Sequence, residues 1–155
     1  MQSEIQRIVS LLKQTFEKDA WHGPSVKEVL NKITPEQVFN RLPDTHSIIE
    51  LVAHMTSWRI YVTKKLSGDD AYKVTEELNF PQNTNWTDTV KQLEESQCQL
   101  ITAIEKFPEE KLTELVAGFR DPYTYYTLIH GIIHHDLYHT GQIMLIHKAM
   151  AKQTI

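Results

Sequence analysis

Five of the eight histidines lie in one stretch, "HGIIHHDLYHTGQIMLIHK" (130–148). Neutral imidazole is a good ligand for zinc, nickel and other transition metals. A helix turns by about 100° per residue, so His135 and His139 would lie one turn apart on one face. The other three point more than about 90° away from His135: His130, His134 and His147. The stretch therefore contains one pair whose spacing allows two imidazoles to share a cation.

A third histidine, His54, lies in "HSIIELVAHMTSW" (46–58). It falls at the edge of the apolar stripe of another predicted helix, as a residue lining a cavity between helices would. Together with the pair it would give three neutral nitrogen ligands, which suit zinc or nickel and leave coordination positions open. His46 is a competing candidate, but it is about 80° from His54 and close to the helix start. The alternative is that all three are core histidines with hydrogen-bond partners and no metal.

Four further residues could serve such a site. Glu50, one turn before His54, is the first candidate for a general acid or base, although it could instead orient a ligand or face solvent near the helix start. Gln142, beside the histidine pair, could orient an imidazole or a bound water. Trp58 and Tyr61 could form the wall of a pocket, or could simply belong to the core.

Two other polar residues are interpreted more conservatively. Asp136 follows His135 but points about 100° away, so we expect it to pair with a neighbour or to lie on the surface. Cys98 has no recognisable activating partner, so we expect a small buried residue rather than a nucleophile.

These side chains must be positioned by helices. Apolar residues recur every three or four positions in four long stretches, which predicts helices over about 3–19, 43–66, 87–107 and 123–150. Asp121 is a predicted N-cap for the last of these, with Pro122 at the first helical position. Short helical turns are predicted in "SVKEVLNKI" and "TPEQVFNRL". No strand pattern or internal repeat interrupts this scheme, which predicts an all-α four-helix bundle formed by one domain, residues 1–155.

The lengths of the connections between helices and the apolar faces of the last helix lead to two further expectations. Roughly 25 and 20 residues separate the first three helices, far more than antiparallel neighbours need, so at least one connection should cross the bundle. The last helix carries a second apolar set opposite its ligand face: Ile133, Leu137 and Met144. Something must cover this set, and we expect either a homodimer contact or the long loops.

Composition excludes several classes of function. The chain has 155 residues, a formal net charge of −4 and a single cysteine. Such a charge does not favour nucleic acid or anionic lipid as a partner. No apolar run is long enough for a membrane span, and the N-terminal stretch does not have the pattern of a signal peptide. One cysteine rules out an intrachain disulfide and is typical of a reducing, cytoplasmic location.

The histidine-bearing stretches resemble the DinB-like (DinB/YfiT) superfamily of bacterial four-helix proteins. The resemblance rests on "HSIIELVAHMTSW" and on the H-x-x-x-H-x-G-Q-I string within "HHDLYHTGQIMLIHK" (134–148), with "WHGPSVKEVL" (21–30) as a further match. It implies an up-down-down-up bundle, frequent homodimers and a metal held by His54, His135 and His139.

The resemblance also implies two types of reaction on a small-molecule substrate. Relatives include transferases that use a low-molecular-weight thiol, such as bacillithiol or mycothiol, and proteins described as metal-dependent hydrolases. Three neutral ligands leave a bound cation its full charge, which favours ionisation of a bound water or thiol. The alternative is a non-catalytic bundle that binds a metal or small ligand, for example in a stress response.

Overall fold

The computed structural model describes residues 2–117 and 122–151 of the chain. Four long helices dominate it: α1 (Glu4–Phe16), α3 (Ile48–Leu66), α5 (Trp86–Lys106) and α6 (Tyr125–Ala151). Shorter pieces lie between them: α2 (Val26–Leu30), α4 (Glu76–Asn79) and the 3₁₀ turns Pro35–Gln37 and Glu109–Thr113. The described ranges contain no strand, and their isolated bridge joins Leu115 to Thr124. The predicted all-α class is confirmed.

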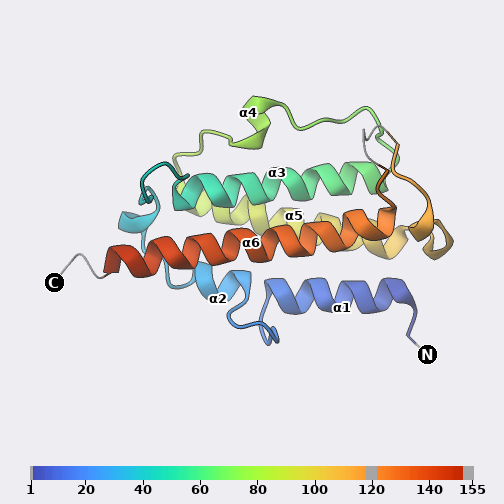
Figure 1. The fold of residues 1–155 in the computed structure, drawn as a ribbon, viewed down its shortest axis with the longest axis horizontal. Coiled ribbons are helices and arrows are strands. Elements are labelled where there is room, and N and C mark those ends of the chain that lie inside the picture. The colour runs from blue at the N-terminus through green and yellow to red at the C-terminus, as the bar shows by residue number, and fades with distance from the viewer. Residues whose placement is uncertain (1, 118–121, 152–155) are drawn as a thin grey trace.

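The long helices run in two directions, which the colour gradient in Figure 1 makes visible. α1 and α6 run one way, and α3 and α5 run the other way. The order along the chain is therefore up, down, down, up. Because α3 and α5 are parallel, the segment 67–85 must return along the length of the bundle. Figure 1 shows it doing so, with α4 part of the way along.

Short-range hydrogen bonds define where the helices begin. Ser3 and Gln6 form a capping box at the start of α1, and Ser25 and Glu28 form another at the start of α2. Each box satisfies two backbone N–H groups that have no partner within the helix.

The start of α6 differs from the prediction. The helix begins at Tyr125, where the Thr124 hydroxyl accepts a hydrogen bond from the Thr127 N–H. Pro122 therefore lies before the helix rather than at its first position. The predicted N-cap, Asp121, lies outside the described residues.

α6 is covered on two sides. Its residues Ile129, Ile132 and Ile133 pack with buried residues of both α1 and α3. Further along, Leu137 and Met144 border a pocket whose opposite side is formed by Pro24 and by Val29 of α2. The second apolar set of this helix thus contacts residues of α1 and of the Pro24–Val29 region of the same chain, and Figure 1 shows α1 and α2 beside α6. That set no longer requires a second subunit to cover it.

No helix within residues 2–117 and 122–151 combines the length and apolar character that a bilayer span requires.

Candidate metal centre

Three histidine side chains from α3 and α6 converge. The Nε2 atom of His135 lies 3.1 Å from the Nε2 of His54 and 3.1 Å from the Nε2 of His139. One ligand nitrogen from each residue falls within 4.8 Å of the others. Sequence reasoning selected these three histidines, and the fold brings them together although His54 is 81 residues from His135.

Hydrogen bonds on the far side of two rings determine their tautomers. The Nδ1–H of His54 donates to the main-chain oxygen of Asn79 at 2.6 Å. The Nδ1–H of His139 donates to Oε1 of Gln142 at 2.6 Å. A neutral imidazole carries one N–H, so the Nε2 atoms of both residues present lone pairs to the centre of the cluster. This is the arrangement that a metal-binding histidine requires.

His135 cannot satisfy both neighbours. Its Nε2 faces two lone pairs, and a single N–H could be donated to only one of them. Its Nδ1 is buried and has no hydrogen-bond partner among the described residues. At least one pair of Nε2 lone pairs therefore meets at close range. A cation at the centre would convert this repulsion into attraction.

The spacing of the nitrogens fits a tetrahedral ion. Zinc–imidazole bonds of about 2.0–2.1 Å place two tetrahedral ligands roughly 3.3 Å apart. The observed 3.1 Å separations are close to this value. Three protein nitrogens leave a fourth position for a water or a substrate atom.

Burial keeps the three rings neutral. It lowers the pKa of His135 to about 3, and any positive charge on His139 or His54, together with the charge of Arg59, acts in the same direction. It lowers the pKa of His139 to about 4, despite the opposing hydrogen bond to Gln142. The pKa of His54 is also lowered, again chiefly by burial. A proton is therefore a poor substitute for a metal ion near neutral pH.

The crossing segment covers one side of the site. The Phe80 ring stacks on His54 with centroids 4.2 Å apart and on His46 with centroids 3.5 Å apart. His46, the competing ligand candidate, is thus separated from His54 by an aromatic ring. The histidine group that could hold a metal does not include it.

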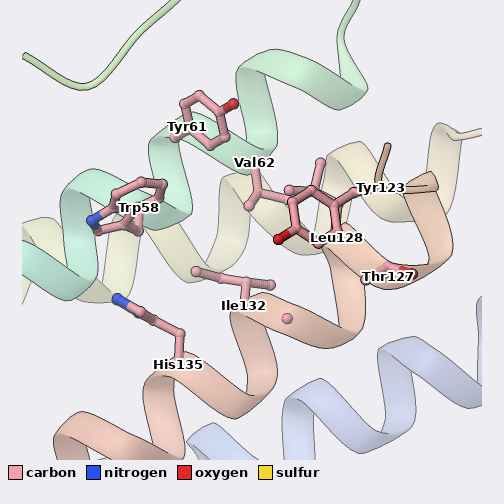
Figure 2. A pocket seen from close by; sticks show the side chains of 9 residues that line it. Trp58, Tyr61, Val62, Tyr123, Thr127, Leu128, Ile132 and His135 are labelled. Carbon is pink, nitrogen blue, oxygen red and sulfur yellow. The ribbon is translucent and has the colours of Figure 1, made fainter. Parts of the chain in front are cut away.

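Trp58 and Tyr61 line a pocket of about 220 Å³ between α3 and α6, and His135 also borders it (Figure 2). The Trp58 indole N–H donates to Oδ1 of Asn79 at 3.0 Å, which fixes the ring. A second hollow, of about 350 Å³, is bordered by His139 and Gln142. Two hollows therefore border the histidine cluster, one at His135 and one at His139.

Glu50 has a different set of contacts from those expected of a general base. Its Oε2 accepts hydrogen bonds from the Ser47 N–H at 2.8 Å and the Ser47 hydroxyl at 2.7 Å. The same oxygen lies 3.3 Å from the Arg41 guanidinium. Burial raises the pKa of Glu50, but these interactions outweigh it and the pKa lies below its ordinary value. The geometry favours a role in capping the start of α3, a role that differs from the ligand-orienting and solvent-facing alternatives of the sequence analysis.

A buried ion pair is formed by the residues that directly follow Trp58 and His135 in the sequence. The Nε and Nη2 atoms of Arg59 donate to the two carboxylate oxygens of Asp136 at 3.2 and 2.6 Å, and both side chains are fully buried. Arg59 also donates to Gln97 of α5, and its guanidinium lies 4.4 Å from the centre of the Phe16 ring of α1. Asp136 thus pairs with a neighbour and does not lie on the surface.

Sequence reasoning missed Asn79, Phe80 and Arg59. A usable signal existed for Arg59, because opposite charges inside two apolar helices, here Arg59 and Asp136, are typical of a buried pair. Asn79 and Phe80 lie in a segment without periodicity, so their contacts with His54 depend on how the crossing connection folds back. Cys98, expected to be buried, is exposed.

Comparison with known proteins agrees with this architecture. The model of the DinB superfamily matches residues 21–143. A crystal structure of a DinB-like protein from Bacillus subtilis superimposes with a TM-score of 0.67 at 20% sequence identity, covering 94% of this chain and 92% of that one. Among curated proteins, no match is found. The matched region includes all three histidines of the cluster, and the chain belongs to the DinB superfamily.

Proposed function

We propose that the protein holds one divalent metal ion, zinc or nickel, through the Nε2 atoms of His54, His135 and His139. The observation that carries this proposal is the convergence of three Nε2 atoms that a single proton cannot satisfy. A metal ion bound there would lower the pKa of a water or thiol in its open coordination position. This chemistry supports a metal-dependent enzyme, either a thiol transferase or a hydrolase, acting on a small molecule.

The residues around the cluster supply the remaining requirements. Asn79 and Gln142 hold two imidazoles in the orientation that presents Nε2. The ring of Phe80 excludes water from one face of His54. Trp58 and Tyr61 form an apolar wall next to His135, where a substrate could lie within reach of the open position.

Metal analysis of the purified protein tests the binding step. We expect one equivalent of zinc or nickel after dialysis, and loss of this equivalent in the His135→Gln variant. The matched control is His134→Gln, which changes an exposed histidine on the same helix. Absence of metal from the unaltered protein, or equal metal content in both variants, would contradict the proposal.

Activity assays separate the catalytic interpretation from a non-catalytic metal-binding bundle. Metal-loaded protein is incubated with a low-molecular-weight thiol and an electrophile, and separately with activated esters. Thiol consumption that stops in His135→Gln indicates a transferase, and ester cleavage that stops in the same variant indicates a hydrolase. Metal binding without either reaction would favour the non-catalytic alternative.

We also propose that the protein forms a homodimer through α6. Tyr138 and Leu145 lie seven residues apart on one face of this helix and are 64% and 59% exposed. Light scattering of the unaltered protein and of Leu145→Lys tests this, and a monomer at micromolar concentration would contradict it.

A further inference from the structure

The pocket beside His135 has a strongly apolar lining. None of the described residues that line it is an aspartate, glutamate, lysine or arginine, and much of the lining is apolar, including Trp58, Val62, Leu128 and Ile132. Figure 2 shows the side chains of α3 and those of α6 facing one another, with the His135 ring at one end. A charged group entering this pocket would lose hydration without gaining an ionic partner.

The volume of the pocket further limits which ligands it can hold. A dry apolar cavity of about 150 Å³ is large enough for benzene. The pocket here measures about 220 Å³, which admits a ring with one small substituent. Whole drug-sized molecules occupy sites of about 300–1,000 Å³ and would not fit entirely. The pocket is therefore suited to the apolar end of a molecule rather than to a large ligand.

Gly131 leaves part of this space open. It lies in α6, one turn before His135, and borders the pocket. A Cβ added at Gly131 would meet no atom within 4 Å. A larger side chain at this position therefore meets no steric barrier at its Cβ and would add atoms at the border of the pocket.

We propose that this pocket binds a neutral, phenyl-sized apolar group of the substrate and so places the attached reactive atom at the metal held by His54, His135 and His139. The inference rests on the proposed function for the metal, whereas the apolar subsite follows from the lining alone. The pocket and the histidine cluster share His135, so a group that fills the pocket would lie beside one of the three proposed metal ligands. Charged or strongly polar parts of the substrate remain outside.

Two thiols that differ in their apolar portion test the proposal. Cobalt-loaded protein is titrated with benzyl mercaptan and with ethanethiol, and thiolate binding is followed by the cobalt absorption spectrum. Burial of the ring should make benzyl mercaptan bind at least about tenfold more tightly. Equal affinities for the two thiols would overturn the proposal.

Two glycine variants show whether the preference arises in this pocket. Gly131→Leu should fill it and lower the affinity for benzyl mercaptan at least about tenfold more than the affinity for ethanethiol. The control is Gly141→Leu on the same helix. An added Cβ at Gly141 also meets no atom within 4 Å, but this residue borders a different pocket. Gly141→Leu should keep the tenfold preference. A preference that persists in Gly131→Leu would contradict the assignment.

A metal-independent measurement separates this inference from the proposed function. Toluene is titrated into chelator-treated protein, and methyl NMR signals of Val62, Leu128 and Ile132 are followed. Shifts in the unaltered protein but not in Gly131→Leu would support the apolar subsite even if cobalt did not bind, in which case only the metal proposal fails. Absence of shifts in the unaltered protein would overturn the subsite.

Discussion

Two polar clusters lie between α3 and α6, and they have opposite character. In one, His54 and His139 direct lone pairs at His135, and the Nδ1 of His135 has no partner among the described residues. In the other, Arg59 and Asp136 have opposite charges and form two hydrogen bonds while fully buried. The first cluster contains only like groups, whereas the second combines complementary ones.

The two clusters come from adjacent positions in the sequence. His135 precedes Asp136 and Trp58 precedes Arg59, so consecutive residues point toward the site and toward the core. The Arg59 group contacts α1, α5 and α6 from its position on α3. It therefore holds together the helices that position the histidines. We expect the ion pair to determine stability and the histidines to determine ligand binding, and each prediction below tests that division.

Removing one partner of the buried ion pair should have the largest effect. Asp136→Ala leaves the Arg59 charge buried without its carboxylate, which should lower the free energy of unfolding by about 3–5 kcal/mol. Urea denaturation of chelator-treated protein measures this loss. The double variant Arg59→Met, Asp136→Leu removes both charges and should recover most of the stability. A loss below about 1 kcal/mol in the single variant would contradict a structural role for the pair.

The histidine cluster should contribute to stability only when metal is present. Zinc at about one hundred times its dissociation constant should raise the free energy of unfolding by about 2.7 kcal/mol. His139→Ala should abolish this increase, since it removes one ligand, and should cost little in chelator because it relieves contact between lone pairs. Thermal unfolding with and without metal measures both effects. A zinc-dependent increase that survives in His139→Ala would contradict the assigned ligand set.

Acid should destabilise the chelator-treated protein through the same histidines. Burial lowers the folded-state pKa values of His135 and His139 to about 3 and about 4, below the unfolded value near 6.5. The unfolded chain then binds more protons, so stability is lost as pH falls from about 6.5 toward 4. Each residue should cost about 1 kcal/mol between pH 6.5 and 5.5.

Denaturation in chelator at both pH values measures this loss. His135→Gln should reduce the pH dependence by more than the control His134→Gln, which changes an exposed residue of the same helix. Identical pH dependence in the two variants would show that His135 is not protonated on unfolding.

The sequence could predict which histidines come together because helical geometry determines which residues of a helix share a face, whereas their role as metal ligands stays a prediction. His135 and His139 are one turn apart whatever the tertiary structure, and the edge position of His54 followed from its own helix. The hydrogen-bond partners of these imidazoles were less predictable. Gln142 was found because it lies on the same helix as His139, whereas Asn79 reaches His54 from the crossing segment between α3 and α5.

Glu50 and Asp136 show a second limit of prediction from the sequence. Helical angles place both near the clustered histidines, but they do not reveal which atoms already have hydrogen-bond partners. The Glu50 carboxylate bonds to Ser47, and Asp136 pairs with Arg59 on another helix. A pairing across 77 residues depends on the register of two packed helices, which periodicity within each helix does not determine.

The smallest expected effect concerns the groups that orient the ligands. Gln142→Leu removes the acceptor for the His139 Nδ1–H, so the ring loses its preferred tautomer and metal affinity should fall about tenfold. Asn79→Ala should have less effect on affinity, because the His54 Nδ1–H donates to the main-chain oxygen, which the substitution retains. It removes only the acceptor for the Trp58 indole N–H. Competition titration with a chromophoric chelator measures both affinities. A larger loss in Asn79→Ala than in Gln142→Leu would show that the Trp58 contact, rather than the imidazole tautomer, controls metal binding.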